Sequence, residues 1–137
     1  MLDTNVISEA FTASPSSAVL DWLAAQHSES VFITAITQAE LLYGIEVLPE
    51  GKRRTRLYQA INNVLSEEFQ ERILPFDEDS ARAFARIVSS REAMGLPISQ
   101  FDAMIASICR SRRAAIATRN VNDFKHCGID IVNPWEK

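Results

Sequence analysis

Apolar and polar positions follow a helical period along several stretches of the chain. The clearest stretch carries Leu57, Ala60, Ile61, Val64 and Leu65, which repeat at the i, i+3, i+4, i+7, i+8 spacing of an amphipathic helix. The same reasoning predicts four further helices. The first is opened by Ser14 and Pro15 and runs to about residue 26, and the second covers about 38–48. The third lies between Asp77 and Gly95 with an apolar face at 81, 84, 85 and 88, and the fourth follows the apolar stripe 101–109.

Short apolar runs between these helices predict strands, at residues 31–33, 73–76, 114–118 and 129–132. Pro75 has no N–H to donate, so its run belongs at a sheet edge or a strand end. Strands that alternate with helices are joined by crossovers and pair in parallel. We therefore expect an α/β fold, a single domain over residues 1–137 with a mostly parallel central sheet flanked by helices on both faces.

Composition narrows the class of protein. A content of 47% hydrophobic residues excludes intrinsic disorder. The chain shows neither a basic, apolar leader at its start nor a run of 18 apolar residues, and it has only two cysteines. These features predict a cytoplasmic protein that does not enter a membrane. The formal net charge of -4 argues against tight binding of nucleic acid through phosphate contacts alone, and leaves open an acidic site such as a metal centre.

Polar residues follow the predicted strands at the points where those strands end. Asp3 follows a shortened first strand, Glu40 lies in the first turn of the next helix, Asp102 opens a later helix, and Asn120 and Asp123 follow the run 114–118. Ligand sites of open parallel sheets lie beyond the carboxyl ends of the strands, so these side chains are expected to converge. Crowded carboxylates repel one another unless a cation lies between them. Oxygen donors without His or Cys favour Mg²⁺ or Mn²⁺, and such ions promote phosphodiester hydrolysis.

Each acid also has a purely structural interpretation. Thr37 and Glu40 fit a capping box, Ser99 and Asp102 fit the same looser pattern, and Asp3 fits a helix N-cap. If all the acids serve in this way, the protein is a catalytically silent module that only binds a partner. A phosphoacceptor receiver domain is a further alternative. Asp77 could serve as its acceptor, but the lone Asp3 and the lack of a lysine at the end of the last strand oppose it.

Four motifs follow one another along the chain. They are Asp3-Thr4-Asn5-Val6-Ile7-Ser8, then Thr37-Gln38-Ala39-Glu40-Leu41 with Gly44, then Asp102-Ala103-Met104-Ile105-Ala106, then Thr118-Arg119-Asn120 with Asp123-Phe124. In this order they resemble the PIN-domain ribonucleases, and most closely the VapC toxins of type II toxin–antitoxin systems. The end of the chain, Val132-Asn133-Pro134-Trp135, is similar to the FitB-like branch. Together the motifs span essentially the whole chain.

The resemblance implies a metal-dependent endoribonuclease, a hydrolase with Mg²⁺ as cofactor. Asp3, Glu40 and Asp102 would be the metal ligands, with Glu40 also orienting or deprotonating the attacking water. The family often has an acid where this chain has Asn120. Either Asp123 takes that catalytic role, or Asn120 fills the position with its neutral oxygen. The residues that would support these acids are Thr4, Asn5, Thr118 and Asn120.

The resemblance also implies partners. Arg119 and Lys125 are candidates for RNA binding, and Arg91 is a weaker one, although ordinary solvated cations fit the same positions. A small DNA-binding antitoxin would neutralise the toxin, which would form homodimers and toxin–antitoxin hetero-oligomers. The apolar side chains that would dock the antitoxin, unless they belong to the core, are Trp22, Leu42, Tyr43, Val47 and Leu48. The alternative remains a silent PIN-fold module that binds an antitoxin-like partner.

Overall fold

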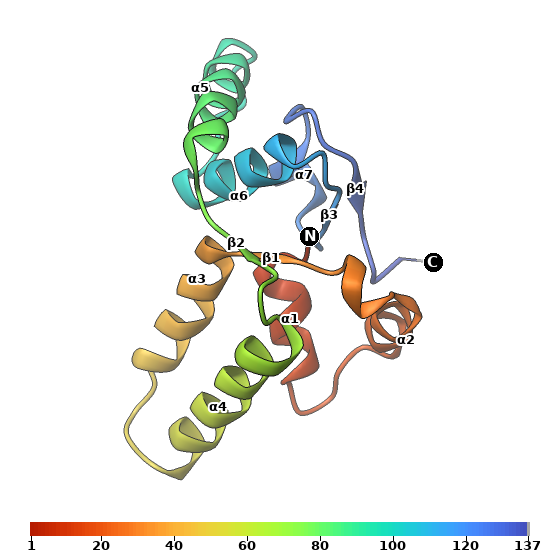
Figure 1. Ribbon diagram of the computed structural model, residues 1–137, viewed down its shortest axis with the longest axis vertical. Coiled ribbons are helices and arrows are strands. Elements are labelled where there is room, and N and C mark those ends of the chain that lie inside the picture. Colours follow the sequence, from red (N-terminus) through yellow and green to blue (C-terminus); the bar gives the residue numbers. More distant parts are fainter. Residues whose placement is uncertain (137) are drawn as a thin grey trace.

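Helices make up most of the chain in the computed structural model, which describes residues 1–136 (Figure 1). The α-helices are α1 (Thr4–Ala10), α2 (Ser17–Ala25), α3 (Ala35–Glu46), α4 (Lys52–Asn63), α5 (Glu78–Ala93), α6 (Gln100–Ser111) and α7 (Val121–Phe124). Two shorter helical turns are η1 (Ser28–Ser30) and η2 (Val64–Glu68). The strands are β1 (Ile33–Thr34), β2 (Ile73–Leu74), β3 (Ile116–Ala117) and β4 (Ile131–Val132). No helix of the described part is long and apolar enough to cross a membrane.

All the strand pairs are parallel, as the sequence predicts. β1 pairs with β2, and β3 pairs with β4. The first residues of the chain join the two pairs: the Leu2 N–H donates to Phe32 O at 2.9 Å, and Leu2 pairs in parallel with Ala117. The first segment therefore runs through the middle of the layer, with β2 at one edge. The strands are shorter than the apolar runs that predicted them, and Pro75 follows directly after β2.

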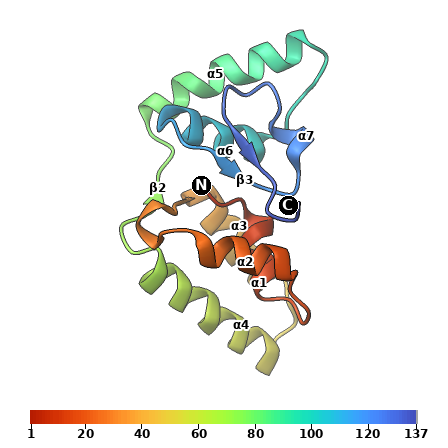
Figure 2. The ribbon, with the colours of Figure 1, turned by 90° about the vertical axis from the view of Figure 1, so that its right-hand side faces the viewer.

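Helices lie on both sides of this layer, with α5 and α6 above it and α1 and α4 below it in Figure 2. Neighbouring residues of a strand point to opposite faces. Ile116 accordingly packs in the apolar cluster that contains Ile87 of α5 and Ile105 of α6. Ala117 packs in the other cluster, which contains Val6 of α1. The expectation of an α/β fold with a covered parallel sheet is thus confirmed.

Two helices begin at residues other than those predicted. α2 is capped by Ser16, whose hydroxyl accepts from the Val19 N–H, so Ser14 and Pro15 precede the helix. The carboxylate of Glu9 accepts from the Ser16 N–H at 2.9 Å and holds this junction. α3 is capped by Thr34, whose hydroxyl accepts from the Thr37 N–H at 3.0 Å. The sequence offered several hydroxyl residues at each point, and the tertiary position of the incoming chain selected among them.

The buried face of α5 also differs from the predicted one. Ser80, Ala83, Ile87 and Arg91 are buried, whereas positions 81 and 85 are exposed. Phe101 of α6, placed on the apolar stripe by its spacing, is likewise 57% exposed. The pattern failed on α5 because two members of its buried face are polar and find hydrogen-bond partners inside the protein.

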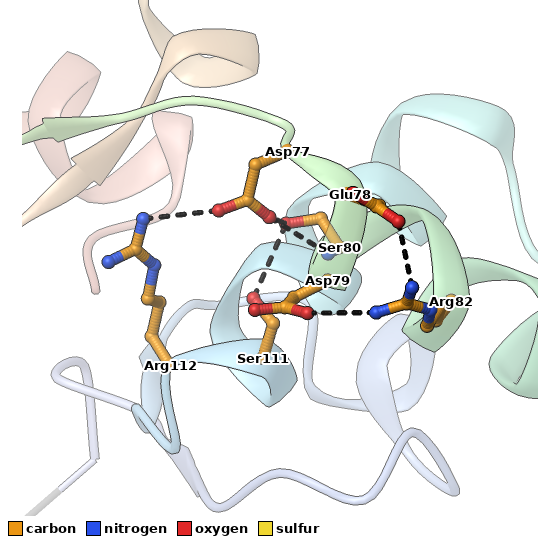
Figure 3. A network of polar contacts seen from close by, with 7 residues as sticks. All are labelled: Asp77, Glu78, Asp79, Ser80, Arg82, Ser111 and Arg112. Carbon is orange, nitrogen blue, oxygen red and sulfur yellow. Dashed lines mark hydrogen bonds and ion pairs between the residues drawn. The ribbon is translucent and has the colours of Figure 1, made fainter.

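A polar network joins the start of α5 to the end of α6 (Figure 3). Asp77 caps α5 by accepting from both the N–H and the hydroxyl of Ser80, each at 2.9 Å. The hydroxyls of Ser80 and Ser111 lie 3.3 Å apart, and Arg112 donates to Asp77 at 3.3 Å. These contacts fix the register of two helices whose other ends lead toward the candidate site.

Candidate active site

Asp3 lies at the centre of a hydrogen-bond network where the first strand segment ends. Its side chain caps α1, and the residue is only 5% exposed. One carboxylate oxygen accepts from the Thr4 N–H at 2.8 Å. The other accepts from the Thr118 hydroxyl at 2.7 Å and from the Asn5 amide at 3.3 Å. Thr118 directly follows β3, so the parallel pairing of the first segment with β3 brings these residues together.

Glu40 lies beyond the first turn of α3 and faces the same network. Because Thr34 caps α3, the predicted capping box of Thr37 and Glu40 is wrong. The Glu40 carboxylate instead accepts from the Thr4 hydroxyl at 2.8 Å. Glu40 therefore does not serve as a helix cap, and its side chain is held beside the first turn of α1.

Asp102 lies in the first turn of α6. Ser99 caps this helix by accepting from the Asp102 N–H at 3.2 Å. Among the described residues, no hydrogen bond runs back from the Ser99 N–H to the Asp102 carboxylate, so this is half of a capping box. The Asp102 carboxylate therefore has no capping role within the described part of the chain.

Asn120 directly precedes α7 and Asp123 lies within it; the sequence did not predict this short helix. The Asn120 N–H donates to the Thr118 hydroxyl at 3.0 Å, which ties this turn to Asp3 through a shared partner. Asn120 and Asp123 line the same polar cavity of about 530 Å³, together with Arg119. Both candidates for the fourth position thus face one cavity next to the carboxylate network.

The carboxylates act on one another electrostatically. Burial is the main cause that raises the pKa of Asp3, Glu40 and Asp102 above the ordinary range. Repulsion adds to it: Asp3 raises the pKa of both Glu40 and Asp102, and Asp123 raises the pKa of Asp3 and Asp102. Acids separated by up to 120 residues in the sequence therefore form one electrostatic unit.

This unit suits a hard divalent cation in its chemistry. Its donors are carboxylate, hydroxyl and amide oxygens, and a cation between the acids would relieve the repulsion that raises their pKa values. Within residues 1–136, no three His, Cys, Asp or Glu side chains stand close enough to hold an ion as they are placed. The residues present therefore fit such an ion by charge and donor type, and binding it requires their side chains to move closer together.

The candidate cations differ in position. The Arg119 guanidinium lies over the Trp135 ring, 5.2 Å from its centroid, at the edge of the polar cavity. Lys125 is exposed. Arg91 is buried, and its guanidinium donates to four backbone carbonyls inside the protein, so the suggestion that it contacts RNA is wrong. The signal that separates Arg91 from the others is its place in the buried period of α5.

The apolar candidates for partner docking differ in how far they are exposed to solvent. Tyr43 and Val47 are 68% and 60% exposed, whereas Trp22 and Leu42 pack against the core. Leu48 is half-buried. Of the five, Tyr43 and Val47 are thus the side chains that present apolar surface to solvent.

Comparison with known proteins identifies the family of this chain. Residues 1–129 match the PIN domain. The chain is 40% identical to "VapC ribonuclease Y4jK" of Sinorhizobium fredii, covering 99% of this chain and 97% of that protein. It is 36% identical to "Toxin FitB" of Neisseria gonorrhoeae, covering 98% and 97%. A solved structure of FitAB bound to an IR36 DNA fragment contains a similar chain, with a TM-score of 0.95, 35% identity and coverage of 99% and 95%. The chain belongs to the PIN domain family, in the group that contains the VapC ribonucleases and the FitB toxin.

Proposed function

We propose that this protein is a Mg²⁺-dependent endoribonuclease toxin of a type II toxin–antitoxin system. The observation that carries the proposal is the electrostatic unit formed by Asp3, Glu40 and Asp102, which come from three separate elements. Structural capping accounts for Asp3 alone among them. Folding carboxylates into mutual repulsion costs stability, and such perturbed groups cluster at functional sites.

The proposed roles follow from the contacts. Asp3 and Asp102 hold the metal ion, with Asp3 fixed by its three donors. Glu40 completes the metal site and orients the attacking water, and its hydrogen bond from Thr4 sets the direction of its carboxylate. When bound, the ion polarises the phosphodiester and stabilises the developing negative charge.

The remaining roles rest on the polar cavity. Asp123 supplies the fourth acid, and Thr118, Asn5 and Asn120 keep the network in place. Arg119 and Lys125 attract the RNA backbone. Ribonucleases of this family depend on divalent metals, and we assign Mg²⁺, with Mn²⁺ as a substitute, because every donor here is a hard oxygen.

Membership of this family also supports a proposal about the partners of the protein. We propose that a small DNA-binding antitoxin covers the site and that the complex binds DNA, as FitAB does in the similar structure. Tyr43 and Val47 are the exposed apolar positions for docking. The toxin acts in the cytoplasm, where its RNA substrate is, and forms homodimers. We assign the PIN domain to residues 1–137, of which Lys137 lies outside the described residues.

Cleavage of a labelled single-stranded RNA tests the proposal. We expect cleavage with Mg²⁺ or Mn²⁺, none with a chelator, and a loss of at least about 100-fold in the Asp102→Asn variant. Asp21→Asn, which changes an exposed acid on α2, is the matched control and should cleave normally. Persistent cleavage by the Asp3→Asn/Asp102→Asn double variant would contradict the assignment. The absence of saturable Mn²⁺ binding in calorimetry, together with no cleavage, would favour the silent interaction module.

A further inference from the structure

Arg91 is a buried cation whose three guanidinium nitrogens all donate to backbone carbonyls. It is 5% exposed and lies in the last turn of α5. Its Nε donates to Leu96 O at 2.8 Å, and its Nη2 donates to Pro97 O at 3.4 Å. Its Nη1 donates to Asp123 O at 2.9 Å and to Lys125 O at 2.7 Å. No carboxylate within residues 1–136 forms a salt bridge with it.

The first pair of carbonyls belongs to the connection between α5 and α6. Gly95 has a φ of +72° and ends α5, and the Leu96 N–H returns to Arg91 O at 2.9 Å. Leu96 is therefore held by Arg91 twice, through its N–H and through its carbonyl. Three residues later Ser99 caps α6, whose first turn carries Asp102.

The second pair of carbonyls belongs to α7 and the residue that follows it. Arg91 binds the backbone carbonyl of Asp123, the same residue whose carboxylate belongs to the candidate site. One guanidinium thus bridges the segment that leads into Asp102 and the helix that carries Asp123. The planar fork of arginine can serve several acceptors at once, whereas a lysine ammonium is a single point on a flexible stem.

Desolvating a guanidinium is costly, and here hydrogen bonds to four carbonyls offset that cost. The carbonyls in turn need donors, because unpaired buried backbone groups are unfavourable. The positive charge also acts on Asp102, where it opposes the causes that raise the pKa of that carboxyl. Arg91 is therefore tied to both acids, through the backbone of one and through its charge on the other.

We propose that Arg91 is a positioning residue that sets the spacing between Asp102 and Asp123 and thereby the affinity of the site for a divalent cation. This inference rests on the proposed function of the same site. It assigns to Arg91 no contact with RNA. Its effect passes through the α5–α6 connection and through α7.

Three variants separate positioning from general stability. Arg91→Met removes the donors and the charge, Arg91→Lys keeps the charge and loses the fork, and Arg86→Met changes an exposed arginine of the same helix. Hydrogen exchange of the metal-free proteins reports on segments 95–98 and 121–127. Calorimetric titration with Mn²⁺ reports on the site, and steady-state kinetics separate kcat from KM for RNA.

We expect Arg91→Lys to remain folded, to exchange faster in both segments, and to bind Mn²⁺ about 10-fold to 100-fold more weakly. Its kcat should fall while its KM for RNA stays within about twofold of the wild-type value, because no RNA contact is lost. Arg91→Met should show a larger change in the same direction, and Arg86→Met should match the wild type.

Wild-type Mn²⁺ affinity in a folded Arg91→Lys variant would overturn the inference, as would unchanged exchange in both segments. A rise in KM with kcat unchanged would overturn it too, since that result indicates an RNA contact. If the wild-type protein itself neither binds Mn²⁺ nor cleaves RNA, the proposed function fails, and the inference that rests on it fails with it. If the wild type binds Mn²⁺ and the variants bind it equally, only the role of Arg91 is wrong.

Discussion

The Thr4 hydroxyl donates a hydrogen bond of 2.8 Å to Oε1 of Glu40, which links the first turn of α1 to α3. Thr4 is also the residue whose N–H binds Asp3 at 2.8 Å. One residue therefore holds two of the candidate catalytic carboxylates, with its backbone on one and its side chain on the other. This arrangement couples the directions of the two acids.

Replacing Thr4 with valine keeps the shape of the side chain and removes the donor. We expect the pKa of Glu40 to rise, since the hydrogen bond from Thr4 now lowers it, and RNA cleavage near neutral pH to fall about 10-fold. Single-turnover cleavage measures the effect. Thr4→Ser, which restores a hydroxyl, is the control and should recover most of the rate. Equal rates in the valine and serine variants would show that the hydroxyl does not matter.

The metal-free protein should become less stable relative to an Asp102→Asn variant as the pH rises. The pKa of Asp102 is raised by burial and by neighbouring acids, so the folded protein binds its proton more tightly than the unfolded chain does. That contribution to stability is present at low pH and is lost as the pH rises through the folded pKa, above the ordinary value of 3.8. Thermal unfolding of both proteins in chelator across this range measures the difference. A difference that stays constant with pH would contradict the raised pKa of Asp102.

Adding Mg²⁺ or Mn²⁺ should reverse this loss of stability. A cation that binds only the folded state stabilises it by mass action, by about 2.7 kcal/mol at a free concentration 100 times its Kd. The gain should grow with pH, because the acids must be ionised to bind the ion. Thermal unfolding at two pH values with and without the cation tests this, and Asp102→Asn should show a smaller gain.

The cap at Asp77 should contribute mainly through its hydrogen bonds and little through its ion pair. Asp77→Asn keeps an N-cap acceptor for Ser80 and loses the charge opposite Arg112. We expect it to unfold within about 1 °C of the wild type, because exposed ion pairs contribute little. Asp77→Ala also removes the acceptor and should lower the unfolding temperature by roughly 3–5 °C. A large loss in the asparagine variant would mean that the ion pair dominates.

Arg119 should contribute to RNA affinity in a manner that depends on salt. If it binds phosphate, Arg119→Ala should weaken binding to all RNA sequences by a similar factor and reduce the slope of log K against log salt by about 1. Filter binding of RNA in chelator, over a range of salt concentrations, measures both quantities. Arg86→Ala, on an exposed face of α5, is the control. An unchanged slope would show that Arg119 serves the Trp135 contact instead.

The sequence predicted the kind of most elements but neither α1 nor α7, and it predicted the ends of elements poorly. The helix at Leu57 to Leu65 follows from spacing alone, and it forms as α4 with the η2 turn. The caps at Ser14 and Thr37 were wrong, because each competes with a second hydroxyl residue, Ser16 or Thr34. Local pattern cannot rank such neighbours, since the choice depends on where the chain enters from the preceding element.

The acids of the candidate site could be predicted from the sequence. The parallel-sheet rule predicts from the sequence alone that Asp3, Glu40 and Asp102 lie at one rim of the sheet. Fourteen acids remain when these three and Asp123 are set aside, and they balance the fourteen basic residues. The net charge of -4 therefore equals the charge of the candidate site.

By itself, the sequence determined the α/β class, the parallel pairing and the acids at the strand ends, because these depend on local periodicity and on general rules of connection. Only the tertiary structure decided that Thr4 donates to Glu40, that Thr118 donates to Asp3, and that Arg91 is buried between the α5–α6 connection and α7. The bonds from Thr4 to Glu40, from Thr118 to Asp3 and from Arg91 to Asp123 join residues 32 to 115 positions apart. Their geometry depends on how helices pack against the sheet, which no local pattern encodes.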